Sequence, residues 1–221
     1  MEKKLVIAID GPAGAGKTTI AKALANKLCI PFFSTGAMYR ALALKCLRQN
    51  LDPKTEKTAQ QIANSTNLDI SYKNGNQSVL LDGEDVTNLL YTDDVSMYAS
   101  QISVHKIIRQ KMVEIQRNVA GSQSVIMDGR DIGSVVLPMA NFKFYLDADV
   151  EVRAKRRFDQ LASQGNQITY EEVLEDMKQR DIRDKTRDIS PLVVATDAII
   201  IDCTNLTIDE VVKKFIDYIG E

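Results

Sequence analysis

The sequence predicts an α/β fold in which a mostly parallel sheet of about five strands is flanked by helices. Short apolar runs, typical of strands buried on both faces of a parallel sheet, recur along the chain. Segments with helical spacing lie between these runs, so strands and helices alternate as in βαβ units. The clearest expected strands cover residues 5–9, 124–127, 142–146 and 198–201, and the clearest helices residues 17–28 and 208–219.

The length and charge of the chain limit the classes of function. The 221 residues suffice for one domain of about 150 residues with an insertion, but not for two large domains. Twenty-eight basic and 30 acidic residues give a net charge of −2, whereas proteins that coat nucleic acids are normally basic. We therefore expect no nucleic-acid partner.

The cysteines favour a reducing compartment, and the single histidine limits the metal sites that the chain could form. Cys29, Cys46 and Cys203 are odd in number and widely spaced, which predicts free thiols that act as small buried apolar residues. The single histidine, His105, excludes a cluster of histidine ligands within one chain, and we interpret it as surface or insertion packing without a role. With neither a membrane-length apolar run nor a signal-peptide pattern, we expect a cytoplasmic protein with no membrane contact.

A glycine-rich loop follows the first expected strand. Residues 11–18 read Gly-Pro-Ala-Gly-Ala-Gly-Lys-Thr, which fits G-x-x-x-x-G-K-[ST] between a buried strand and an amphipathic helix. Such a loop points consecutive N–H groups at phosphates, and its lysine lies between the β- and γ-phosphates. The motif predicts binding of a nucleoside triphosphate in a P-loop NTPase-type fold, with Mg²⁺ held by either Thr18 or Thr19.

Two segments depart from the strand–helix alternation. An Asn-Gly pair at 74–75 between alternating segments predicts a β-hairpin, and we interpret residues 65–100 as a small insertion carrying it. Residues 153–186 are arginine-rich and helical in pattern, with an interruption at 165–167, and predict a mobile helical lid. The core would then comprise residues 1–64 and 101–221.

The arginines indicate a phosphate-rich substrate. Seven of the 11 arginines lie between positions 130 and 187, although some of them could instead form ion pairs on a solvated helical face. Arg180, Arg183, Asp184 and Arg187 have spacings that would place them on one face of a helix. Asp131 follows a buried strand, where α/β sheets bind ligands, and could alternatively cap a helix or turn. A nucleoside monophosphate suits this set, because its phosphate is already ionised and needs no catalytic base.

Several motifs together resemble the bacterial cytidylate kinase family. They are Ile9 to Lys17 at the glycine loop, Thr-Gly-Ala-Met-Tyr-Arg at 35–40, Asp-Gly-Glu-Asp-Val-Thr at 82–87, Asp-Gly-Arg-Asp-Ile-Gly at 128–133 and Ser-Pro-Leu at 190–192. The resemblance runs nearly end to end, and the second and fourth blocks together are the most specific. It implies transfer of the γ-phosphate of ATP to CMP or dCMP with Mg²⁺, by a core, an inserted monophosphate-binding region and a short lid.

The resemblance also implies roles for individual residues. The ATP phosphates would be held by Gly11, Pro12, Ala13, Gly14, Ala15, Gly16, Lys17, Thr18 and Thr19, with Arg153, Arg156 and Arg157 acting on ATP from the lid. The acceptor and transferred phosphates would be held by Arg40, Arg130, Arg180 and Arg187, and Thr35 would also bind the substrate. Ser100, Arg109 and Asp131 would recognise the cytosine edge, and Asp184 the sugar. Catalysis would rest on Lys17, Arg130, Arg180 and Arg187.

One departure and two alternatives accompany this interpretation. Ser34 stands where the family commonly has an acidic residue, so no role that needs a carboxylate is assigned there. Another small-molecule P-loop kinase, acting on a different nucleotide or a coenzyme precursor, is the first alternative. A nucleotide-gated ATPase or switch is the second, but it predicts a basic face that this composition lacks. We expect the protein to act as a monomer.

Overall fold

The computed structural model contains one five-stranded sheet with the strand order β2-β6-β1-β7-β8. It describes residues 4–73, 75–163 and 165–220. β1 (Val6–Asp10), β6 (Val125–Asp128), β7 (Phe142–Asp147) and β8 (Ile199–Asp202) lie within one residue of the expected strands, and β2 (Phe32–Ser34) completes the sheet. The pairs β1–β7 and β7–β8 are parallel. The predicted α/β fold with a parallel sheet of about five strands is therefore confirmed.

The chain divides into two compact units, which are described separately. The unit that we call the P-loop unit comprises Val6–Cys29 and Asp128–Glu221, and the hairpin unit comprises Ile30–Met127 with the N-terminal residues up to Leu5. The two units are groups of residues that contact one another. The insertion expected at residues 65–100 is defined by function instead, and it stays a prediction.

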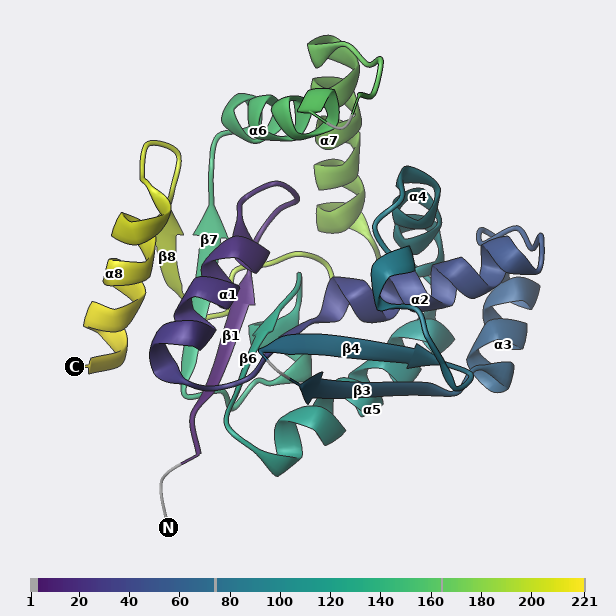
Figure 1. The fold of residues 1–221 in the computed structure, drawn as a ribbon, viewed down its shortest axis with the longest axis horizontal. Helices are drawn as coiled ribbons and strands as arrows, with labels where there is room; N and C mark the ends of the chain where they lie inside the picture. Colours follow the sequence, from purple (N-terminus) through teal and green to yellow (C-terminus); the bar gives the residue numbers. More distant parts are fainter. Residues whose placement is uncertain (1–3, 74, 164, 221) are drawn as a thin grey trace. The chain divides into compact units, whose positions relative to one another are not determined.

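In the P-loop unit, apolar strands are covered by amphipathic helices. Ile7, Ala8 and Ile9 of β1 are fully buried, as expected for a strand covered on both faces. α1 (Lys17–Leu28) packs beside α8 (Ile208–Gly220) in Figure 1. Phe215 of α8 stacks on Phe144 of β7 with ring centroids 4.1 Å apart, which fixes α8 against the sheet.

The arginine-rich segment folds as a helical hairpin, as predicted. α6 (Val150–Ser163) and α7 (Tyr170–Thr186) lie next to each other in Figure 1. They share a small apolar core that includes Ala154, Leu161 and Val173. A capping box between Thr169 and Glu172 begins α7. The apolar core explains why a segment so rich in charge still forms two stable helices.

The end of α7 differs from the expected helical stripe. α7 ends at Thr186, and Arg187 is its C-cap with an extended ψ of 140°. The N–H of Leu192 donates to the carbonyl of Asp184 at 2.7 Å, so the returning chain satisfies an end carbonyl of the helix. Arg183 is exposed whereas Asp184 is partly buried. The four residues therefore do not form one continuous helical face.

In the hairpin unit, β3 (Leu68–Lys73) and β4 (Asn76–Leu81) form the predicted antiparallel hairpin, extended by β5 (Glu84–Asp85). Asn74, expected at the tip, lies outside the described residues. Its helices are α2 (Thr35–Arg48), α3 (Glu56–Ser65), η1 (Thr87–Leu89), α4 (Asp93–Ile102) and α5 (Lys106–Ser122), and it also contains β2 and most of β6. α2 and α4 pack together through Ala43, Val95 and Ala99.

Two expectations for single residues need correction. His105 lies outside residues 65–100 and is buried, with Nδ1 2.9 Å from Glu56 Oε2 and Nε2 3.0 Å from the Pro53 carbonyl oxygen. It joins the start of α5 to the first residue of α3 and to the loop before that helix. All three cysteines are free, as expected, but only Cys46 and Cys203 are buried. Cys29 is exposed, because it ends α1 in a left-handed turn with φ of +54°.

Among the described residues, no helix combines the length and the apolar character needed to cross a membrane.

Candidate functional site

The glycine loop joins β1 to α1 in the P-loop unit, and its glycines are required by geometry. Gly11 has φ of +145°, and a Cβ there would lie 2.0 Å from the carbonyl oxygen of Leu146 on β7. Gly16 has φ of +88° and is the N-cap of α1, so the loop enters the helix through a left-handed residue. The loop therefore packs closely against β7 and leads directly into the N-terminus of α1.

The Lys17 ammonium is held by the loop itself. Its Nζ donates to the carbonyl oxygens of Gly11 at 2.7 Å and Pro12 at 2.6 Å, and the residue is buried. Burial and the nearby Arg130 guanidinium hold the pKa of Lys17 well below its usual range, against the opposing effect of Asp128, Asp10 and Asp184. The Lys17 ammonium is therefore already in position, and a bound anion would add negative charge that stabilises its charged form.

Thr18 and Asp128 form a hydroxyl–carboxylate pair beside the loop. Thr18 Oγ1 donates to Asp128 Oδ2 at 2.6 Å, and Asp128 ends β6. Thr19 is exposed one residue further along α1. The sequence left the two threonines equivalent, and the contact with Asp128 distinguishes them.

The next group combines arginines with acidic side chains. Arg130 Nε donates to Asp184 Oδ2 at 2.7 Å, and Arg187 lies 3.9 Å from both Asp184 and Asp131. Burial raises the pKa of Asp184, but Arg130, Arg180 and Arg187 outweigh it and hold the pKa below its usual range. For Arg130, burial opposes the charged form, yet Asp184 raises its pKa further. Both groups are charged at neutral pH, and the structure brings Arg130, Asp131, Asp184 and Arg187 together as a network.

The three arginines of α6 have different surroundings. Arg153 is buried and donates to the carbonyls of Ala148 at 2.8 Å and Ala13 at 3.0 Å, and to Asp181 Oδ2 at 2.7 Å. Arg156 donates from Nη2 to the Cys203 carbonyl at 3.1 Å, and Arg157 to Gln160 at 3.1 Å. Arg153 therefore links the tip of the glycine loop to α6 and α7, whereas Arg156 and Arg157 are less buried.

No role was assigned to Asp10 or Asp181 from the sequence. The Asp10 carboxylate accepts from the N–H groups of Ile132 at 2.8 Å and Gly133 at 2.7 Å. The signal for Asp10 is an acidic residue that ends an apolar strand immediately before the glycine loop. Asp181 lies in the arginine-rich segment, and only the packing of α7 shows that it is buried against Arg153.

Four of the predicted residues lie in the hairpin unit. Thr35 begins α2 and is buried, and Ser100 lies in α4, where its carbonyl accepts from the Ser103 hydroxyl at 3.0 Å. Arg40 extends over the Tyr91 ring at 5.6 Å, and Arg109 of α5 is buried 5.6 Å from the Tyr39 ring centroid. Each guanidinium therefore rests on an aromatic face within its own unit.

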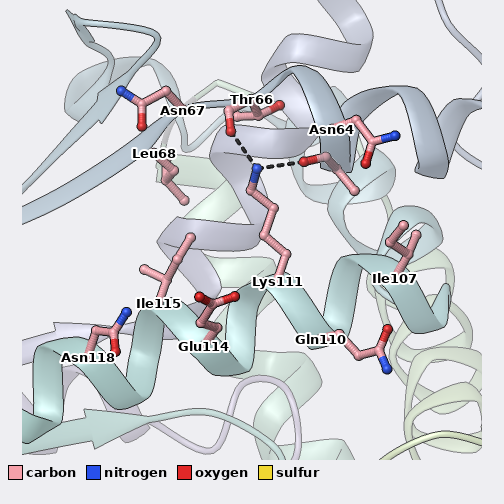
Figure 2. Close-up of a pocket in the computed structure, with 11 residues that line it drawn as sticks. Asn64, Thr66, Asn67, Leu68, Ile107, Gln110, Lys111, Glu114, Ile115 and Asn118 are labelled. Carbon is pink, nitrogen blue, oxygen red and sulfur yellow. Dashed lines mark hydrogen bonds between the residues drawn. The ribbon is translucent and has the colours of Figure 1, made fainter.

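The hairpin unit also contains a pocket of about 500 Å³ between the end of α3 and α5. Figure 2 shows the Lys111 ammonium in this pocket, where it donates to the carbonyl oxygens of Ala63 and Thr66. Lys111 therefore caps the C-terminal end of α3. None of the predicted site residues lines this pocket, and we do not assign it to the candidate site.

Comparison with known proteins identifies the family. The sequence matches the cytidylate kinase family over residues 7–221. It is 51% identical to a cytidylate kinase of Caldicellulosiruptor saccharolyticus over 97% of this chain and 95% of that protein. It is 48% identical to a cytidylate kinase of Clostridioides difficile over 98% of each.

A solved structure supports the fold. Shikimate kinase from Bacteroides thetaiotaomicron is similar with a TM-score of 0.51 at 13% identity, covering 98% of this chain and 99% of that one. Such a distant likeness shows the fold alone. The family match, by contrast, extends over nearly the whole sequence, including the glycine loop and the arginine–carboxylate network of the P-loop unit: the chain belongs to the cytidylate kinase family.

Proposed function

We propose that this protein transfers the γ-phosphate of ATP to CMP or dCMP, giving ADP and CDP or dCDP. The observation that carries the proposal is the combination, within the P-loop unit, of a glycine loop with the network of Arg130, Asp131, Asp184 and Arg187. A loop alone supports binding of one nucleotide. A second set of cations with its own acids supports an acceptor that also carries phosphate.

Lys17 is the donor-side cation in this proposal. When ATP binds, its ammonium exchanges the carbonyls of Gly11 and Pro12 for phosphate oxygens. The loop N–H groups and the N-terminus of α1 add further positive potential. We assign Gly11 to Thr19 to the triphosphate, which agrees with the position of the loop at the end of β1.

The donor set beside the loop fits Mg²⁺. A hydroxyl and a carboxylate already in contact are the oxygen ligands that this ion takes from proteins, and phosphates and water supply the rest. We propose that Thr18 and Asp128 hold Mg²⁺, which would neutralise charge on the β- and γ-phosphates. Thr18 is chosen over Thr19 because its hydroxyl contacts Asp128.

The acceptor needs no protein base, because the second pKa of a phosphomonoester is near 6 and its oxygen is already a nucleophile at neutral pH. The bond from γ-phosphorus to the bridging oxygen of ADP breaks as the bond to the acceptor oxygen forms. We assign charge stabilisation of the transferred group to Arg130, Arg180 and Arg187, and the acceptor phosphate to Thr35 and Arg40. The chemistry is then positioning and charge compensation.

Selection of cytosine follows from hydrogen-bond complementarity. We propose that the Asp131 carboxylate accepts from the amino group of cytosine, with Arg109 and Ser100 donating to the ring acceptors. Uracil would present a carbonyl to the same carboxylate, which is repulsive. Asp184, at present paired with Arg130, would accept from a sugar hydroxyl.

The α6–α7 hairpin is proposed to act as a lid that excludes water during transfer. Arg156 and Arg157 would act on ATP directly. For Arg153 we propose a positioning part instead, because its guanidinium is committed to Ala148, Ala13 and Asp181. We further propose that the enzyme acts as a monomer in the cytoplasm.

The proposal is tested by ADP release with ATP and Mg²⁺ in the presence of CMP, dCMP, UMP, AMP, GMP or dTMP in turn. Fast turnover with CMP and dCMP alone is the expected result. Preference for another monophosphate would mean that the protein is a kinase for that nucleotide instead. Stimulation by none of them, with ATP still bound, would contradict the proposed acceptor class.

A further inference from the structure

Asp10 is a buried carboxylate at the junction between the sheet and the glycine loop. It is the last residue of β1, directly before Gly11, and only 5% of its surface is exposed. Nothing in the proposed reaction uses it, since it is not among the residues assigned to either nucleotide. A charged group this deeply buried requires an explanation, because burial of a carboxylate is costly.

Both carboxylate oxygens of Asp10 bind the same short segment. Oδ1 accepts from the Ile132 N–H at 2.8 Å and Oδ2 from the Gly133 N–H at 2.7 Å. These N–H groups begin η2 (Ile132–Val136), a π-helical turn. The residue at the N-cap position, Asp131, makes no capping hydrogen bond with its own side chain. Asp10 therefore caps the turn from a distant part of the sequence.

The surroundings of Gly133 are shaped to this contact. A Cβ on Gly133 would lie 3.4 Å from Asp10 Oδ2 and 3.2 Å from Cδ of Lys143. The Lys143 ammonium, in turn, is 2.8 Å from both carboxylate oxygens of Asp197. Lys143 thus packs its stem against Gly133 while its charge is bound elsewhere, and the carboxylate of Asp10 is held chiefly by backbone N–H groups.

Burial opposes the charged form of Asp10. Burial raises its pKa to about 6, although the N–H groups of Gly133 and Ile132 act in the opposite direction, and Asp131 and Lys17 also contribute with opposite signs. Buried groups with perturbed ionisation are frequent at functional sites. The segment that Asp10 binds begins directly after Arg130 and Asp131. A fixed backbone at this place would fix the positions of these two side chains.

We infer that Asp10 is a positioning residue whose carboxylate fixes the start of η2, and thereby the placement of Arg130 and Asp131 beside the glycine loop. The inference rests on the proposed function for the roles of Arg130 and Asp131. Its structural part, a carboxylate that holds the backbone of Ile132 and Gly133, is independent of any substrate.

The test is Asp10→Asn, with Asp85→Asn as the matched control. Asparagine keeps one carbonyl acceptor but turns an NH₂ group toward a backbone N–H, so one of the two hydrogen bonds is lost. Asp85 also accepts from a backbone N–H, that of Thr87 at 3.0 Å, but it is exposed and lies in the hairpin unit. Gly133→Ala disturbs the same contact from the other side and serves if Asp10→Asn does not fold.

Amide hydrogen exchange of the nucleotide-free protein measures the hydrogen bonds from Ile132 and Gly133 to Asp10 directly. In Asp10→Asn we expect the Ile132 or Gly133 amide to exchange at least about 10-fold faster than in the unmodified protein. Steady-state kinetics then measure how the loss of these hydrogen bonds affects turnover and the preference for CMP. We expect kcat with CMP to fall about 10-fold or more, KM for ATP to stay within about twofold, and the kcat/KM ratio of CMP over UMP to fall at least about threefold. A general loss of stability would not change that ratio.

The outcomes separate this inference from the proposed function. If the unmodified protein phosphorylates CMP but Asp10→Asn keeps its amide protection and its CMP-over-UMP ratio, the inference is overturned while the function stands. If the unmodified protein does not phosphorylate CMP, the function fails, and unchanged exchange at both amides would still refute the structural part. Equal effects of Asp85→Asn would also overturn it.

Discussion

At the scale of one residue, Lys17 shows how the glycine loop holds a cation in place for a phosphate. Its ammonium is buried on the carbonyls of Gly11 and Pro12, with a pKa held well below the usual range chiefly by burial and by Arg130. An arriving polyphosphate would relieve both effects at once. The same residue therefore costs stability in the free protein and favours nucleotide binding.

Replacing Lys17 with methionine should separate these two effects. We expect Lys17→Met to lower kcat/KM by at least about 10³-fold, because a positioned cation is lost from the transferring phosphates. The free energy of unfolding at pH 7 should not decrease, since a buried charge is replaced by an apolar chain of similar length. Initial-rate kinetics and urea unfolding measure the two quantities. Retained turnover would remove the loop lysine from the mechanism.

Asp10 makes a pH-dependent contribution to stability. Its pKa is raised from 3.8 to about 6 on folding, so the folded state binds the proton more tightly. That contribution is fully present below pH 4 and is lost as the pH rises through about 6, a change of about 3 kcal/mol. Between pH 4 and 7, the unmodified protein should therefore lose about this much unfolding free energy relative to Asp10→Asn. Parallel denaturant titrations of both proteins give the difference, and parallel pH profiles would contradict it.

Asp131 should set the preference for cytosine. In Asp131→Asn, an amide can both donate and accept, so the repulsion toward uracil is removed. We expect the kcat/KM ratio of CMP over UMP to fall by at least about 10-fold, mainly because UMP improves. The exposed acid Asp188, changed to asparagine, is the control that should leave the ratio alone. An unchanged ratio in Asp131→Asn would contradict its assignment to the base.

At the scale of elements, Arg153 joins α6 to α7 by a buried ion pair and joins this hairpin to the glycine loop by a hydrogen bond. Arg153 on α6 contacts Asp181 on α7 at 2.7 Å and the Ala13 carbonyl at 3.0 Å. The tip of the loop is close as well, since a Cβ on Gly14 would lie 3.2 Å from Cβ of Arg153. Movement of the hairpin and the shape of the loop are therefore coupled within this unit.

Breaking that pair should be far more costly than breaking a surface pair on the same helix. Arg153→Met leaves Asp181 buried without its partner, and we expect a loss of about 3 kcal/mol in unfolding free energy. Lys155→Met removes an exposed pair with Asp159 on α6 and should cost less than about 0.5 kcal/mol. Urea unfolding of both variants provides the comparison. Equal losses would show that the bridge is not a structural link.

Elements with a long apolar pattern were more predictable than short strands and than contacts between residues distant in sequence. Continuous apolar runs placed β1, β6, β7 and β8 to within one residue, whereas β2, with three residues, is too short for its pattern to be distinguished. The stop of α7 before Arg187 depends on the returning chain around Leu192, which no local spacing encodes. The roles of Asp10 and Asp181 depend in the same way on partners that are distant in sequence. Motifs indicated the loop and the arginines, because their chemistry is local.

At the scale of the whole molecule, the compact units correspond to different parts of the sequence and of the proposed reaction. The P-loop unit contains the glycine loop, the arginine–carboxylate network and the helical hairpin, and the chain leaves it after Cys29 and returns at Asp128. The hairpin unit contains Thr35, Arg40, Ser100 and Arg109. Variants can therefore be chosen so that each unit is tested without altering the side chains of the other.

The thiols provide a whole-molecule test of the fold. Cys46 is buried, and burial raises its pKa to about 11, while Cys203 is buried and donates to the Ala15 carbonyl at 3.3 Å. Only Cys29 is exposed among the three. We expect one thiol to react rapidly with dithiobisnitrobenzoate in the folded protein and all three after denaturation. Cys29→Ser should abolish the rapid phase, and two fast thiols in the folded state would contradict the burial described here.

The exposure of Cys29 has a practical consequence. A maleimide dye can be attached to the unmodified sequence at a single place, without removing any other cysteine. That place is the C-cap of α1, and the glycine loop is at the opposite end of this 12-residue helix, roughly 18 Å away at 1.5 Å per residue. This spacing suits energy transfer to a fluorescent nucleotide, so occupancy of the loop could be followed optically, one molecule at a time.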